Sequence, residues 1–173
     1  INPYNFSGSM DAISQGASDG MKLYLNIIAM LIVTLALVAL VNTILECFPN
    51  IAGAPITLQR ILGLMMSPVT WLMGISWNEA SIAGNLLGTK TVLNEVIAFI
   101  ELAALPKHLL RKHSDLIMVY ALCGFANLSS IGIQIGGLGT MAPERRSEII
   151  ALGFKAVIAG TLSSCMSGTI VGI

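Results

Sequence analysis

Glu95 is the residue whose type and surroundings point most directly to binding chemistry. It directly follows residues 88–94, inside a stretch that is otherwise mostly apolar. A buried carboxylate needs hydrogen-bond donors, and a diol supplies two hydroxyl donors at a spacing that suits the two carboxylate oxygens. An acidic group inside a membrane segment is a functional candidate by default, so we expect Glu95 to contact a ligand. A structural ion pair with Lys90 is the alternative.

A second polar cluster interrupts the apolar stretch that follows. Asn127 offers both a donor and an acceptor, and Ser129 and Ser130 add hydroxyl groups. If a helix breaks here, its exposed backbone groups and its dipole join them. No arginine lies at either interruption, so we expect a neutral, hydroxyl-rich solute. Phe125 could stack on a flat face of the ligand or simply pack, and a continuous helix glued to its neighbours by Asn and Ser remains an alternative.

The composition predicts a membrane protein. Hydrophobic residues make up 55% of the chain and charged residues only 10%, and the mean hydropathy is +0.82. A soluble domain carries about 25% charged residues. The formal net charge is zero, so no basic surface suggests a nucleic-acid partner.

The sequence offers little support for catalysis. His108 and His113 lie in a polar boundary segment, and neither a Gly-x-Ser-x-Gly elbow nor an HExxH pattern occurs. The three cysteines are far apart, which argues against a disulfide or zinc framework. We therefore expect no enzyme, no bound cofactor and no metal site in this segment.

The hydrophobic pattern predicts an all-α, polytopic membrane fold. The expected elements are a loop with a short helix at residues 1–21, a transmembrane helix at 22–46, an interfacial kinked helix at 56–77, a re-entrant hairpin at 79–105, a discontinuous transmembrane helix at 116–142 and a truncated transmembrane helix at 147–173. The hairpin is expected because a single span would bury Lys90 and Glu95. Burying a charge at mid-membrane costs about 2.5–3.5 kcal/mol.

Two motifs resemble those of the concentrative nucleoside transporter family. Residues 88–99 read GTKTVLNEVIAF and look like its second hairpin motif. Residues 123–134 read CGFANLSSIGIQ and, with 139–143, look like its second broken helix. Residues 19–23 fit as well, and the resemblance covers nearly the whole chain. It implies a sodium-coupled nucleoside importer, trimeric, with two inverted repeats and alternating access through an elevator-like moving domain.

The resemblance also implies roles for individual residues. Glu95 would hold the ribose hydroxyls from the hairpin, Asn127 and Ser130 would hold the ribose from the broken helix, and Phe125 would line the pocket. Possible supporting residues are Asn94, Ser129 and Lys90. The family's first-repeat motif, which reads the base, does not occur here, and neither do its first-repeat sodium positions. We therefore expect this chain to be the C-terminal half, with the Na⁺ ligands in the missing N-terminal half.

Two other functions remain open at this point. Glu95 could titrate in a proton-coupled nucleoside transporter, or the polar and small residues could serve a non-transporting membrane assembly module. The expected partners are a nucleoside, the lipid bilayer and two further copies in a homotrimer. The expected location is a bacterial inner (plasma) membrane, crossed several times.

Overall fold

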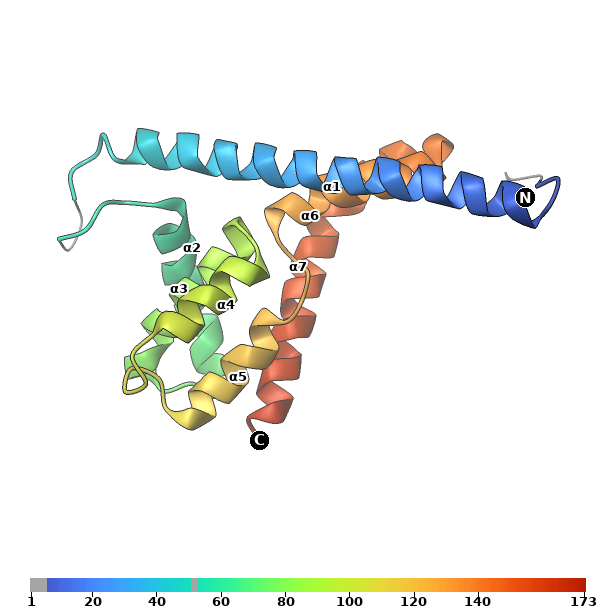
Figure 1. The fold of residues 1–173 in the computed structure, drawn as a ribbon. Helices are drawn as coiled ribbons and strands as arrows, with labels where there is room; N and C mark the ends of the chain where they lie inside the picture. The colour runs from blue at the N-terminus through green and yellow to red at the C-terminus, as the bar shows by residue number, and fades with distance from the viewer. Residues whose placement is uncertain (1–5, 51–52) are drawn as a thin grey trace.

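The computed structural model describes residues 6–50 and 53–173, and in these ranges the regular elements are helices (Figure 1). In chain order they are α1 (Ser9–Leu45), α2 (Leu58–Leu72), α3 (Trp77–Val92), α4 (Glu95–Ala104), α5 (Lys112–Leu122), α6 (Leu128–Met141), the 3-10 turn η1 (Pro143–Arg145) and α7 (Arg146–Val171). The all-helical expectation is confirmed. Residues 1–5 of the first expected segment lie outside the described residues.

Helix α1 runs along one side of the molecule, with α6 packed beside it and α2 to α5 gathered beneath (Figure 1). It has 37 residues, which corresponds to about 55 Å of helix. Helix α1 and the segment Pro143–Val171 are the two that are long and apolar enough to cross a membrane, judged by length and composition among the described residues. Most large apolar side chains of α1 are exposed, as a helix in lipid requires.

The boundary expected near residue 22 is wrong, because residues 9–21 belong to the same helix as the apolar span. Local hydrogen bonds stabilise this polar first part. The Ser7 N–H donates to Asp11 at 3.0 Å, the Gln15 amide donates to Asp19 at 3.0 Å, and Lys22 pairs with Asp19 at 3.2 Å. Such pairs, three or four residues apart, offset the weak helix propensity of the small residues here.

The helix expected at 56–77 is also shorter than predicted. Helix α2 ends at Leu72, and Gly74 turns the chain with a positive φ of 100°. Trp77 then begins α3, and its ring meets that of Trp71 edge to face at 6.1 Å. Pro68 lies inside α2 without ending it. The turn makes α2 and α3 an antiparallel pair, and Trp77, expected at the end of the interfacial helix, instead begins α3.

Small residues bring α2 and α3 into backbone contact. Gly84 and Gly88 are four residues apart on α3, and they face Gly63 and Ser67 on α2. A Cβ atom at Gly84 would lie 2.5 Å from the Gly63 carbonyl oxygen, and one at Gly88 would lie 2.6 Å from the Gln59 carbonyl oxygen. This is the small-xxx-small packing typical of membrane helices. The spacing of these small residues is visible in the sequence, but the sequence analysis did not predict a helix contact from it.

The hydrophobic core lies between α3, α4, α5 and α7. Its fully or nearly fully buried members include Leu87, Ala98, Ile117, Leu122 and Cys165. These residues pack the α3–α4 hairpin against α5 and α7. The core therefore fixes where the hairpin tip lies.

An ion pair closes the hairpin base at the other end. The Glu79 carboxylate, on the first turn of α3, lies 3.2 Å from the Arg111 guanidinium and accepts a hydrogen bond from the Arg111 backbone N–H at 3.4 Å. Arg111 directly precedes α5. The base of the hairpin is thus tied to the start of α5, while its tip reaches the end of that helix.

The glycine contact between α2 and α3 gives a stability prediction. We expect Gly84→Ala to lower the unfolding temperature of the purified full-length protein in detergent, because the new methyl group meets backbone atoms that cannot rotate away. Overpacking of this kind costs about 1–3 kcal/mol. Gly20→Ala on α1 is the matched control, since its Cβ would meet nothing within 4 Å. Equal melting temperatures for the two variants would contradict the close contact.

Candidate functional site

The tip of the α3–α4 hairpin meets the break between α5 and α6. Glu95 is the first residue of α4, and Asn127 directly precedes α6. The Asn127 side-chain amide donates a hydrogen bond to Oε2 of Glu95 at 3.0 Å, joining residues that are 32 positions apart. The fold therefore brings together the two polar residues that the sequence analysis placed at separate interruptions.

Asn127 is held in this orientation by its own helix. It caps the N-terminus of α6, and its Oδ1 accepts from the Ser130 N–H at 2.8 Å and from the Ser129 hydroxyl at 2.6 Å. Ser130 Oγ donates in turn to the Asn127 carbonyl at 2.6 Å. Two donors on Oδ1 leave the amide nitrogen to face Glu95. All three side chains are buried. The Asn127 amide is therefore held in a fixed orientation as a hydrogen-bond donor.

Two helix N-termini converge on the Glu95 carboxylate. Asn94 caps α4 by accepting from the Ile97 N–H at 2.9 Å, and Asn127 caps α6. A helix N-terminus favours negative charge, so Glu95 lies where an anion is stabilised. Among the described residues, Oε1 of Glu95 has no hydrogen-bond partner. This oxygen can accept a further hydrogen bond.

Phe125 is 54% exposed and lines a cavity of about 320 Å³ between the helix break and α7. Its polar lining consists of Ser130, Gln134, Ser163 and Ser164. Our sequence analysis missed the last three. Gln134 lies one turn beyond Ser130 on α6, which a helical reading of that segment would have found. Ser163 and Ser164 lie on α7, and only the fold brings them here.

Lys90 does not pair directly with Glu95. Both residues are described, and the direct ion pair weighed in the sequence analysis is not formed. The Lys90 ammonium instead donates to the Ala121 carbonyl oxygen at 3.1 Å, and the side chain is completely buried. The Glu95 carboxylate instead accepts a hydrogen bond from the amide of Asn127.

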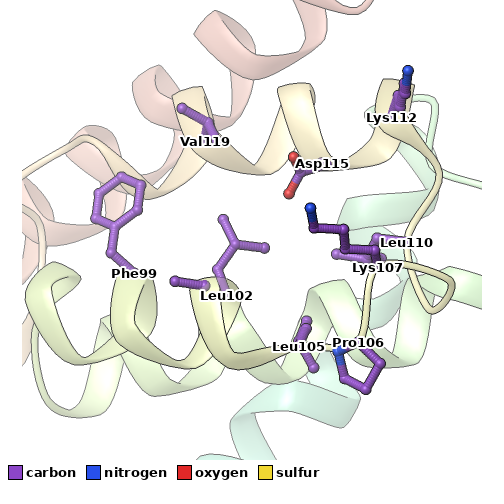
Figure 2. Close-up of a pocket in the computed structure, with 10 residues that line it drawn as sticks. Phe99, Leu102, Leu105, Pro106, Lys107, Leu110, Lys112, Asp115 and Val119 are labelled. Carbon is purple, nitrogen blue, oxygen red and sulfur yellow. The ribbon is translucent and has the colours of Figure 1, made fainter.

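A larger cavity, of about 480 Å³, lies between α4 and α5 (Figure 2). Phe99, Leu102 and Val119 line its apolar part, and Lys107 and Asp115 line its charged end. Neither Glu95 nor Asn127 lines this cavity or the smaller one at Phe125. We place the candidate site at the hairpin tip, because convergent polar groups rather than volume determine recognition. Among the described residues, no group of three or more His, Cys, Asp or Glu could hold a metal ion.

The two roles of Asn127 can be separated by substitution. Asn127→Ala removes both the cap and the donor to Glu95, and we expect it to destabilise the protein by about 1–2 kcal/mol. Asn127→Ser keeps a capping oxygen but is too short to donate to Glu95, so we expect it to retain most of the stability. Thermal unfolding of the two full-length variants measures the difference. The same loss in both would mean that the cap contributes nothing.

The chain is similar to known transporters over almost its whole length. The model of the family described as "Na+ dependent nucleoside transporter C-terminus" matches residues 3–172. An uncharacterized transporter of Haemophilus influenzae is 47% identical over 173 aligned positions, which cover 95% of this chain and 41% of that protein. Nucleoside permease NupC of Helicobacter pylori is 39% identical over 170 positions, again 95% of this chain and 41% of the relative.

Solved structures agree with these relatives. A variant of CNTnw in an outward-facing state is 39% identical, with a TM-score of 0.84 over 99% of this chain and 44% of that one. CNTnw in an inward-facing substrate-bound state is 40% identical, with a TM-score of 0.69 over 97% of this chain and 41% of that one. The chain thus spans less than half the length of these proteins. The relatives are transporters and not enzymes, and this chain belongs to the Na⁺-dependent nucleoside transporter family, as a membrane protein matching its C-terminal part.

Proposed function

We propose that the full-length protein is a sodium-coupled secondary transporter that imports nucleosides by alternating access. The observation that carries this proposal is the hydrogen bond between Glu95 and Asn127 at the hairpin tip. It presents a carboxylate acceptor and an amide donor side by side. A ribose diol needs both, because each of its hydroxyl groups donates and accepts.

The ribose replaces the hydrogen bond between the Asn127 amide and the Glu95 carboxylate. Its two hydroxyls donate to the Glu95 oxygens, and one of them accepts from the Asn127 amide. Ser130 and Ser129 support this step by holding the Asn127 side chain, and Asn94 supports it by starting α4 at Glu95. Phe125 lies at the adjacent cavity, where its exposed ring can cover the ligand. The base would be read by residues outside this chain.

The helix breaks fit a membrane setting. Helices α3 to α6 have between 10 and 16 residues, whereas a span needs about 20. We therefore place α3 and α4 as a re-entrant hairpin and α5 and α6 as two halves of one discontinuous crossing. The capping bonds of Asn94 and Asn127 satisfy backbone groups that lipid would leave unpaired. Helices α1 and α7 are the complete crossings in this part of the protein.

Two further observations support sodium coupling and motion. The family description names Na⁺, and we place the ion's ligands outside this chain. The same neighbouring protein matches with a TM-score of 0.84 in an outward-facing state and 0.69 in an inward-facing one. Sequence identity is nearly equal in the two cases, so the difference lies in helix placement. We assign the long exposed helix α1 to a static scaffold in a homotrimer of the inner membrane, and the hairpin to the moving part.

The transport class is tested on the full-length protein in proteoliposomes. We expect uridine to accumulate when an inward sodium gradient is present and not when choline replaces sodium. Accumulation that follows a proton gradient and ignores sodium would instead favour the alternative in which Glu95 titrates. An absence of uptake for every nucleoside would favour the assembly module.

The ribose contact is tested by combining a site variant with a ligand variant. We expect Glu95→Gln to weaken uridine uptake by about tenfold to a hundredfold, because a hydrogen bond to a charged group contributes about 1.5–3 kcal/mol. Asn127→Ala and Ser130→Ala should weaken it less. Glu101→Gln is the matched control, since it changes an exposed glutamate on the same helix.

Competition by 2′,3′-dideoxyuridine makes the test specific for the diol. The wild-type protein should strongly prefer uridine, and Glu95→Gln should lose most of this preference. A variant that binds both ligands more weakly but keeps the preference would contradict a ribose contact at Glu95.

A further inference from the structure

Lys90 is a buried charge that the ribose site does not use. Its side chain is completely buried and is the largest fully buried side chain among the described residues. It makes no direct ion pair with a carboxylate in the described part of the chain. A charge taken out of water must be paired or coordinated, because its desolvation is costly. The buried charge of Lys90 therefore requires a partner that offsets the cost of its desolvation.

That partner is the end of a half-helix. Lys90 Nζ donates to the carbonyl oxygen of Ala121 at 3.1 Å, and Ala121 lies in the last turn of α5. The last four carbonyls of a helix lack intrahelical partners, and the helix dipole makes this end negative. The Cys123 N–H donates to the Tyr120 carbonyl at 3.3 Å, and the chain leaves the helix there, so the Ala121 carbonyl is left to the Lys90 ammonium. A cation is the natural complement of such an end.

The Lys90 ammonium lies close to the backbone of the break. A Cβ atom at Gly124 would lie 3.4 Å from Lys90 Nζ and would clash with the hydroxyl of Ser164 on α7. Gly124 is thus a position where the backbone of the break approaches both α7 and the ammonium. Cys165, also on α7, is buried in the same core. The buried ammonium of Lys90 therefore lies beside the end of α5 and the break, where the break approaches α7.

We propose that the Lys90 ammonium is a tethered cation, filling at this break the position where the C-terminal end of a broken membrane helix otherwise binds a free cation. Half-helix C-termini and unwound carbonyls bind coupling cations in transporters of other folds. Here the chain supplies the charge itself.

The tethered cation also has a positioning role. Lys90 joins the last turn of α3 to the end of α5, across 31 positions, and Glu95 joins the start of α4 to the start of α6, across 32. The two bonds flank the same junction. A ligand at Glu95 replaces the second bond but leaves the first intact. Lys90 thus keeps the hairpin tip in register with the break while Glu95 changes partners, and its charge attracts the carboxylate without touching it.

Chemical rescue of the full-length protein tests this inference. We expect Lys90→Ala to lower the unfolding temperature in detergent and to reduce uridine uptake by at least about tenfold, since a buried carbonyl end loses a charged partner. Methylammonium chloride should restore part of the lost unfolding temperature, because it supplies an ammonium group that can donate to the Ala121 carbonyl. Tetramethylammonium chloride at equal ionic strength should not, because it has no N–H donor. Lys155→Ala, an exposed lysine on α7, should respond to neither salt.

Three outcomes would overturn the inference. The first is that both salts raise the unfolding temperature of Lys90→Ala equally. The second is that Lys90→Met, which keeps the length without the charge, matches the wild-type protein in stability and uptake. If Lys90→Ala cannot be purified, the yields of monodisperse Lys90→Arg and Lys90→Met decide. A higher yield for Arg supports the tethered cation, and an equal yield is the third outcome against it. The stability readout needs no transport, so it remains informative even if the proposed function fails.

Discussion

The structure depends on the need to satisfy backbone and side-chain polar groups where helices end inside an apolar chain. At the break between α5 and α6 the two ends are treated differently. The N-terminus of α6 is capped by Asn127, with Ser129 and Ser130 holding the cap. The C-terminus of α5 receives the Lys90 ammonium. Asn127 and Lys90 also tie the break to the hairpin. The same contacts therefore satisfy the helix ends and position the candidate site.

The hairpin is anchored at its base and along its length, and its tip is where we propose that the ribose binds. Glu79 and Arg111 tie the base to the start of α5, and the glycine contacts of α3 hold it against α2. The core between α3, α4, α5 and α7 fills the space between these points. Glu95 therefore reaches Asn127 as the end point of a rigid assembly. A binding site that must exchange an internal hydrogen bond for a ligand needs this rigidity, because a loose tip would lose part of the binding energy in ordering itself.

Because this chain carries only part of the proposed site, cavity volume alone is a poor guide to where the ligand binds. The larger cavity between α4 and α5 is mostly apolar, whereas the smaller one at Phe125 is lined by Ser130, Gln134 and two serines of α7. Glu95 and Asn127 meet at the hairpin tip and line neither cavity. The chain spans 41% of the length of the relatives compared above. A ligand held between two halves would contact only one wall in this part of the protein. The polar groups at the hairpin tip therefore indicate the proposed site better than an enclosed cavity does.

The sequence by itself determined the helical class, the two interruptions and the residue types at each, because hydrophobicity and polar breaks are local properties. It also contained the family motifs around Glu95 and Asn127. It did not determine that residues 9–21 continue α1, since side-chain pairs offset weak propensity there, or that α2 ends at Leu72, where Gly74 turns the chain. Only the tertiary structure decided that Glu95 meets Asn127 and that Lys90 meets the end of α5 instead of Glu95. These partners lie more than thirty positions apart, and the packing of the hairpin against two half-helices, which no local pattern encodes, selects them.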